Sequence, residues 1–250
     1  MTPQIPAYLP AFESAIRPIA AAIALGLIWM GGWRMPAPVR SRLATAGALS
    51  VALLAWLFVA QYLGSSDVYI ATNDARVPTV LLGLLIPLII AALSLWLSAN
   101  VASLVSAIPL PWIVAAQIYR VGGGIFLVLW ADGRLPWQFA LPAGIGDVAT
   151  GCGAVVAAML LAEQAAGSRR TVYAWCLFGI ADLVIALTMG AMTSPGRAHL
   201  FALAEPNLLI SAYPLVMVPT FAVPLALMLH SLVLWQLRWK IGSTGRLATV

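Results

Sequence analysis

Residues 141–151 read Leu-Pro-Ala-Gly-Ile-Gly-Asp-Val-Ala-Thr-Gly and place one carboxylate, Asp147, inside a long apolar run. Residues 178–186, Phe-Gly-Ile-Ala-Asp-Leu-Val-Ile-Ala, repeat the pattern around Asp182. A charged side chain at the centre of a bilayer costs at least about 2.5–3.5 kcal/mol, so it normally faces protein or water and not lipid. Both segments therefore predict membrane helices that turn an acid toward the inside of a bundle.

The composition excludes a water-soluble globular protein. Of the 250 residues, 62% are hydrophobic and 8% are charged, and the mean hydropathy is +0.98. Soluble domains carry about 25% charged residues, whereas runs of about 20 apolar residues are typical of membrane-spanning helices. The net charge of +5 comes without any run of five basic residues. We therefore expect the protein to be surrounded by membrane lipid and to have no nucleic-acid partner.

Seven apolar segments predict seven transmembrane helices in a single domain over residues 1–250. The segments run over about 16–33, 43–63, 79–98, 112–131, 137–162, 171–192 and 208–237. Residues 100–110 are also apolar, but the break Pro109-Leu110-Pro111 favours a segment that lies along the membrane interface. The predicted fold class is an all-α integral membrane protein, a bundle of seven transmembrane helices without a soluble domain.

The basic residues predict the orientation of this bundle. Eight of them fall on one face when the spans are counted, namely Arg34, Arg40, Arg42, Arg169, Arg170, Arg238, Lys240 and Arg246. The other face holds four, Arg17, Arg76, Arg134 and Arg197, offset by acids that include Glu13. The positive-inside rule makes the first face cytoplasmic, which places the N-terminus outside and the C-terminus inside. The expected location is the plasma (inner) membrane of a bacterium.

Three charges remain inside the spans, Arg120, Asp147 and Asp182. At 1.5 Å per residue, Arg120 and Asp182 lie roughly 12 and 16 Å from the inner face and Asp147 roughly 15 Å from the outer face, close to the middle of a core about 30 Å thick. We expect Arg120 to pair with one of the acids, with Gln117 as an additional hydrogen-bond partner. Thr150 and nearby glycines leave space for water around Asp147, which favours Asp147 as the acid that is free to exchange a proton.

Prolines interrupt the last span. Pro214, Pro219 and Pro224 recur every five residues, and each removes a backbone hydrogen bond from a helix. Broken helices at mid-membrane often line sites in transporters, although a kinked packing helix has the same signature. Asn207 and Ser211 are the polar residues of this segment that we predict to bind a ligand.

No metal, haem or retinal site is predicted, and neither is a catalytic residue or a cofactor. His199 falls in an outer loop and His230 near the inner end of the last span, so the two cannot ligate one ion. A retinal Schiff base needs a buried lysine, and the predicted spans contain no lysine. Phosphate-loop, zinc-protease and nucleophile-elbow motifs are also missing from the sequence.

Three functions fit these features. The first is a transporter or proton/ion-coupled carrier that binds a small molecule, a proton or an ion at Gln117, Arg120, Asp147 and Asp182. The second is a membrane enzyme that acts on a lipid or isoprenoid with an Asp as general acid. The third is a packing subunit of a larger membrane complex, and an oligomer of this chain is compatible with all three.

The orientation is open to a labelling test. A cysteine placed at Ser168, in the predicted loop between the fifth and sixth spans, is expected to react with an impermeant reagent only from the cytoplasmic side. Labelling from the outside would contradict the predicted number of spans.

Overall fold

The structure, a computed structural model, describes residues 4–72 and 79–247, with side chains described as far as Arg238. Every regular element in these ranges is a helix. The helices are α1 (Tyr8–Arg34), α2 (Val39–Ser65), α3 (Thr79–Leu97), α4 (Ala99–Ala107), α5 (Leu110–Ala115), η1 (Ala116–Gly124), α6 (Ile125–Ala131), α7 (Trp137–Ala162), α8 (Ser168–Thr193), η2 (Leu209–Ser211), η3 (Val218–Ala222) and α9 (Val223–Leu247). Elements η1 and η2 are 3₁₀-helices, and η3 is a π-helix.

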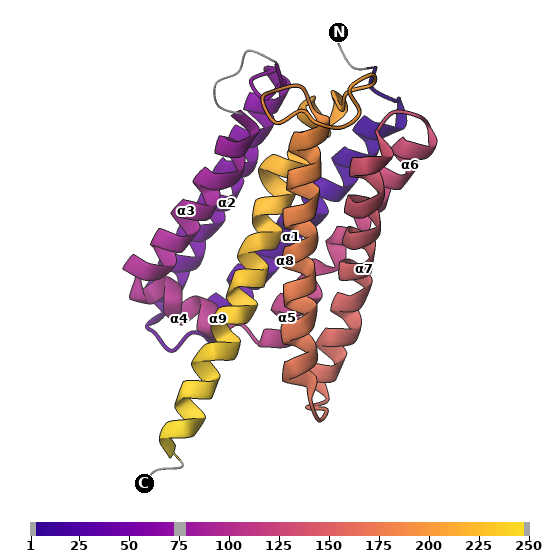
Figure 1. Ribbon diagram of the computed structural model, residues 1–250. Helices are drawn as coiled ribbons and strands as arrows, with labels where there is room; N and C mark the ends of the chain where they lie inside the picture. The colour runs from indigo at the N-terminus through magenta and orange to yellow at the C-terminus, as the bar shows by residue number, and fades with distance from the viewer. Residues whose placement is uncertain (1–3, 73–78, 248–250) are drawn as a thin grey trace.

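Within the described residues, seven helical stretches are long and apolar enough to cross a membrane, as the sequence predicts. They are Tyr8–Arg34, Val39–Ser65, Thr79–Leu97, Leu110–Ala131, Trp137–Ala162, Ser168–Thr193 and Val218–Arg238. Their length and composition indicate an integral membrane protein. The first helix starts at the end of the bundle at which the connection from α8 to η3 lies, and α9 runs out beyond the opposite end (Figure 1).

The last span begins at Val218, ten residues later than the prediction of 208. Residues 208–217 form the short 3₁₀ turn η2 and irregular turns. Pro214 and Pro219 have no backbone N–H to donate, so a regular helix cannot continue through this region. The prediction followed apolar composition, which is the same for a helix and for a buried irregular segment such as Leu215–Met217.

Side chains of neighbouring helices donate hydrogen bonds to carbonyl groups of the last span. Pro224 cannot donate to the carbonyl of Thr220, and the indole Nε1 of Trp56 on α2 donates to that oxygen instead, at 3.1 Å. Two residues of η1 also donate to carbonyls of this span, the Tyr119 hydroxyl to that of Ala222 at 2.9 Å and Gln117 Nε2 to that of Ala226 at 3.0 Å. Backbone groups in hydrocarbon must find partners within the protein, so these bonds hold the π-helix in place.

The segment after α3 is a separate short helix, α4, at the end of the bundle where α9 leaves it (Figure 1). The Ser98 hydroxyl accepts a hydrogen bond from the Val101 N–H at 3.3 Å and so caps the first turn of α4. The helix ends before Pro109, and α5 starts after that residue. The predicted break at the two prolines is therefore confirmed.

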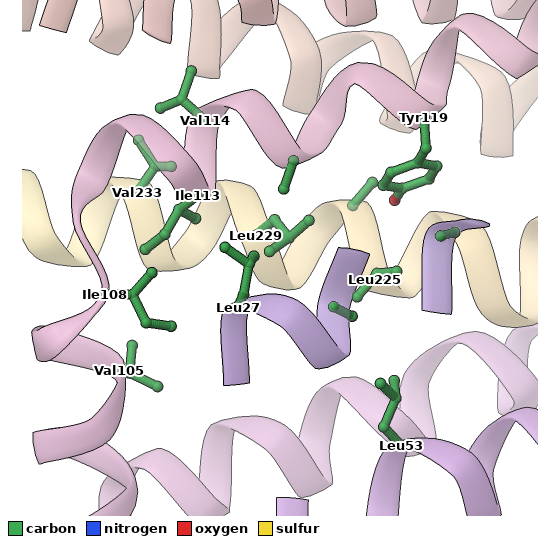
Figure 2. Close-up of a cluster of buried hydrophobic side chains, with 14 of the residues drawn as sticks. Leu27, Leu53, Val105, Ile108, Ile113, Val114, Tyr119, Leu225, Leu229 and Val233 are labelled. Carbon is green, nitrogen blue, oxygen red and sulfur yellow. The ribbon is translucent and has the colours of Figure 1, made fainter. Parts of the chain in front are cut away.

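The apolar core has two parts. The larger one joins residues of α1 to α5, η1, α7, α8, η3 and α9, and Figure 2 shows part of it. Its labelled side chains are Leu27, Leu53, Val105, Ile108, Ile113, Val114, Tyr119, Leu225, Leu229 and Val233. The smaller part includes Leu9, Phe126, Phe139 and Leu215. Close packing of this kind, not the hydrophobic effect, is what associates helices within lipid.

Arg120 and Asp147 lie at the boundary between the two parts of the core. On the span that contains η1, Tyr119 belongs to the larger part and Ile125 to the smaller part, with Arg120 between them. On α7, Asp147 likewise separates Ala143 of the smaller part from Ala157 of the larger part. Arg120 and Asp147 therefore lie between the two apolar clusters, whereas the larger part flanks Asp182 on α8.

The structure shows that another residue is better suited than Ser168 to the labelling test of orientation. Ser168 is buried at the start of α8, so a cysteine there would react poorly. Ala166 is exposed in the same connection, and Ala198 is exposed in the connection after α8. In a background without the exposed Cys152, we expect Ala166→Cys to be labelled only from the cytoplasm. The matched Ala198→Cys should be labelled only from outside.

Candidate functional site

Arg120 lies at the centre of a buried group of side chains that we call the charged cluster, Arg120, Asp147, Asp182 and His230. Its guanidinium is 2% exposed, and its Nε donates to Asp147 Oδ1 at 2.7 Å. Its Nη2 donates to Asp182 Oδ2. Its Nη1 donates to the Gly179 carbonyl at 3.3 Å and faces His230 Nε2 at 3.2 Å. One side chain thus joins η1 to α7, α8 and α9.

Arg120 contacts both acids, whereas the sequence analysis expected it to pair with one. A guanidinium has five N–H donors in a planar fork, so it can serve two carboxylates at once. With both acids ionised, the three charges sum to −1. The cluster becomes neutral when one of the two carboxyl groups binds a proton.

His230 completes the cluster and was missed by the sequence analysis, which placed it near the interface. It is fully buried. A guanidinium only donates, so His230 Nε2 accepts from Arg120 and the ring proton is on Nδ1. That Nδ1 lies 3.2 Å from the Cys176 sulfur, to which it donates, and the thiol donates to the His230 carbonyl at 3.3 Å. Trp175 covers the ring, with centroids 4.9 Å apart.

Counting residues from the other end of the span would have predicted the depth of His230. Counted from Asn207, at the start of the predicted span, His230 is twenty-three residues along and falls near its inner end, but the structure places Asn207 outside the helix. Counted from Arg238 at the other end of the span, His230 lies eight residues in, roughly 12 Å deep. Arg120 has the same separation from Trp112 and so the same depth.

The 3₁₀ geometry of η1 makes room for the contact between Arg120 and Asp147. Side chains at positions i and i+3 of a 3₁₀-helix stack above one another, so Arg120 is in line with Gly123. A Cβ atom at Gly123 would occupy the place of the Asp147 carboxylate. Regular α-helical spacing would instead put Gly124 one turn after Arg120, and three successive glycines do not reveal the local helix type.

Glycines bring α7 close to both of its neighbours, as the small residues around each Asp predict. A Cβ at Gly146 would overlap the Asp182 carboxylate of α8. A Cβ at Gly151 would lie 2.8 Å from the backbone nitrogen of Val121 in η1. Helix α7 therefore packs closely between η1 and α8. Because Gly146 and Gly151 have no side chain, the helices are near enough for Arg120 to reach both acids.

Two further predicted residues lie next to the cluster without binding it. The Gln117 amide nitrogen donates to the Ala226 carbonyl and not to an acid. Thr150 is fully buried and its methyl group faces Gly179. Neither the Gln117 Oε1 nor the Thr150 hydroxyl has a hydrogen-bond partner within the described part of the chain.

Asn207 and Ser211 lie apart from the cluster, in the connection between α8 and η3. Asn207 Nδ2 donates to the Thr193 hydroxyl at 3.4 Å, and its Oδ1 accepts from the Ile210 N–H at 3.2 Å. Ser211 accepts from the Ala71 N–H at 3.1 Å. These bonds fold the connection onto its neighbours. The predicted ligand-binding role assumed that both residues lie within a helix, which begins only at Val218.

A small cavity of about 60 Å³ adjoins the cluster. Its polar lining residues are Glu13, Arg17, Tyr119, Arg120 and Asp147. One water molecule needs about 10–15 Å³ measured in this way, so the cavity has room for a few waters and not for a lipid. Asp147 lines it and its side chain is 15% exposed, whereas Asp182 does not line it and is 6% exposed.

Glu13 is a second residue that the sequence analysis placed wrongly. It was counted at the outer face, but α1 starts earlier than predicted and takes Glu13 into the bundle, where the residue is 2% exposed. An acid in the first turns of a span carries no sequence signal of its depth. Only the packing of α1 against its neighbours turns this side chain toward the cavity.

The chain belongs to the family described as Domain of unknown function (DUF8737), whose model matches residues 77–238. The match covers more than half of the chain and includes all four residues of the charged cluster. No curated protein and no solved structure matches the chain.

The glycines that admit the two carboxylates should not tolerate a side chain. We expect Gly123→Ala and Gly146→Ala each to lower the thermal stability and folded yield, because a Cβ at either position overlaps an Asp side chain. Gly26→Ala in α1 is the matched control, since its Cβ would meet open space. Unfolding in detergent monitored by tryptophan fluorescence measures the effect. Equal stability of all three variants would contradict the geometry.

Removal of the guanidinium should destabilise the protein, and removal of either acid should restore part of the loss. Arg120→Leu leaves two acids together in a low dielectric, and breaking a buried pair costs about 3–5 kcal/mol. Because Arg120 contacts both acids, we expect partial recovery of folded yield on adding either Asp147→Asn or Asp182→Asn. Recovery with neither would mean that the acids do not depend on Arg120.

Proposed function

We propose that this protein is a small transporter or proton/ion-coupled carrier of a bacterial plasma membrane, with its N-terminus outside and its C-terminus in the cytoplasm. The charged cluster is the site at which a proton binds and is released. The observation that carries this proposal is one guanidinium held between two carboxyl groups, of which Asp147 alone borders the cavity. This arrangement offers one more acid than base beside a space for water.

The two acids differ in a way that suits separate roles. The side chain of Asp182 is the less exposed of the two, and it accepts a hydrogen bond from Arg120 Nη2. Asp147 uses one oxygen to accept from Arg120 Nε and lies against the cavity. Asp182 is therefore the structural partner of Arg120, and Asp147 is the group that exchanges a proton. An anionic group of a substrate would compete with Asp147 for the guanidinium, which would couple substrate binding to protonation.

The broken last span provides an element that can move. The π-helix η3 contributes Val218, Phe221 and Ala222 to the cavity wall. The Trp56 indole of α2 and the Tyr119 hydroxyl of η1 donate to carbonyls of η3. Discontinuous helices form the sites of many transporters, and exchange of these side-chain bonds would let η3 shift.

The enzyme alternative has less support. Pockets that bind drug-sized ligands are about 300–1,000 Å³, and the cavity beside Asp147 is about 60 Å³. A lipid or isoprenoid would need a much larger opening next to the acid. The third alternative, a packing subunit, predicts that both acids can be replaced without any loss of transport.

Proton flux into proteoliposomes tests the proposal. A valinomycin-set potassium potential drives protons across the membrane, and internal pyranine fluorescence reports them. We expect Asp147→Asn to fold normally and to reduce the flux to about one hundredth, since a positioned proton-transfer group contributes on the order of 100-fold or more. The control is Asp67→Asn, which alters an exposed acid of a connection.

Two outcomes would overturn the proposal. If the parent protein conducts no more protons than protein-free vesicles, with or without added substrates, the proton part of the proposal fails. If Asp147→Asn and Asp182→Asn both conduct like the parent, the charged cluster is a packing element and the subunit alternative takes precedence.

A further inference from the structure

We propose that Glu13 is a second proton-binding group, which relays protons through the cavity between the N-terminal end of the bundle and Asp147. The inference rests on the proposed function in one respect, since it takes Asp147 as the group at the other end of the relay. It adds Glu13 as a proton-binding residue, the cavity as the route, and the N-terminal end of the bundle as the side from which protons enter. The charged cluster alone defines none of these.

The position of Glu13 suits this role. It lies five residues after the start of α1, roughly 7–8 Å along the helix from its first residue. Figure 1 places this end of α1 at the same end of the bundle as the α8–η3 connection. Glu13 and Asp147 line the same cavity from different helices. The cavity therefore extends from the charged cluster toward the end at which the chain begins.

Glu13 is buried without a hydrogen-bond partner. Its carboxyl oxygen Oε1 is among the buried polar atoms that have no partner in the described part of the chain. Arg17, one turn further along α1, donates instead to the Tyr213 hydroxyl at 3.2 Å. A buried carboxylate without a partner is costly. A bound proton removes the charge, and water in the cavity supplies the missing hydrogen bonds.

Glu13 and Asp147 are the two acids that line the cavity, and they are the side chains there that can accept a proton. The charged or titratable side chains that line it are Arg17 on α1, Tyr119 and Arg120 on η1 and Asp147 on α7. The Tyr119 hydroxyl is committed to the Ala222 carbonyl. The lining residues of α6, α8, η3 and α9 are all apolar.

A proton fits this cavity better than a metal ion does. Two guanidinium groups, Arg17 and Arg120, line the same small volume and would repel a free cation. Among the described residues, no group of three or more His, Cys, Asp or Glu side chains is placed to hold a metal ion. A proton differs from a metal ion in that it needs no set of ligands, because it is held by a single carboxyl oxygen.

The relay conserves charge and protons at each step. The Glu13 carboxylate takes a proton from a hydronium ion at the N-terminal end of the bundle, which leaves neutral water. The neutral acid then gives its proton to a cavity water, which passes one of its own protons to Asp147 Oδ2. Asp147 Oδ1 remains bound to Arg120 Nε throughout. Each transfer breaks one O–H bond and forms another, so no oxidant or further reactant is needed.

Infrared difference spectra of the purified protein test the binding of a proton to Glu13 directly, if both pH values lie above about 6, where an exposed carboxyl group with the ordinary pKa of about 4.3 stays ionised. Protonated carboxyl groups have a carbonyl band of their own. We expect Glu13→Gln to remove one such band from the difference spectrum of the parent. Glu163→Gln, the same change at an exposed residue after α7, should leave the spectrum unchanged. An unchanged spectrum in Glu13→Gln would overturn the inference.

Proton flux in proteoliposomes tests the relay. We expect Glu13→Gln to reduce the flux at least tenfold, as for the loss of a positioned proton-transfer group, and Glu13→Asp to keep more of it because the carboxyl group remains. Ala20→Val narrows the cavity while Glu13 stays, and should reduce the flux as well. This variant tests the route even if Glu13→Gln folds poorly.

The outcomes separate this inference from the proposed function. Loss of flux in Asp147→Asn with full flux in Glu13→Gln and in Ala20→Val would overturn the relay and leave the proposed function standing. A parent without flux would overturn the proposed function and the relay, whereas the infrared band of Glu13 would still decide whether the residue binds a proton.

Discussion

The contact between the Arg120 guanidinium and two carboxyl groups is the constraint on which the rest of the structure depends. A guanidinium and two acids can share one buried volume only if their helices approach closely, because each hydrogen bond needs its donor and acceptor within about 3 Å. Gly123 and Gly146 permit that approach, since a side chain at either position would overlap a carboxylate. The 3₁₀ geometry of η1 follows from the same requirement, because it stacks Gly123 in line with Arg120.

The broken last span belongs to the same arrangement. Tyr119 and Gln117, the neighbours of Arg120 on η1, donate to the carbonyls of Ala222 and Ala226. These bonds hold the last span where His230 can accept from Arg120. Two irregular helices, one 3₁₀ and one π, thus support each other through side chains. An irregular backbone is tolerated at membrane depth only where the protein satisfies its polar groups.

Arg120, Asp147 and Asp182 could be predicted as neighbours from the sequence, because each depth follows from a residue count along a helix whose ends are marked by tryptophan or basic residues. His230 escaped the same count because the last helix starts ten residues later than its apolar segment. Glu13 escaped because burial in the first turns of a span depends on which helices cover it. The pairing of Arg120 with both acids also escaped, since a count along single helices gives depth but not the distances between helices.

The sequence by itself determined the class of the protein, the seven spans and the level at which the charges meet. These follow from hydropathy and from a fixed rise per residue, which are local properties of the chain. Tertiary structure alone decided which side chains touch at that level, the helix type of η1, and the cavity that Glu13 and Asp147 share. The physical reason is that close packing, hydrogen bonds and enclosed volume depend on several helices at once, and no single segment encodes the distance to its neighbours.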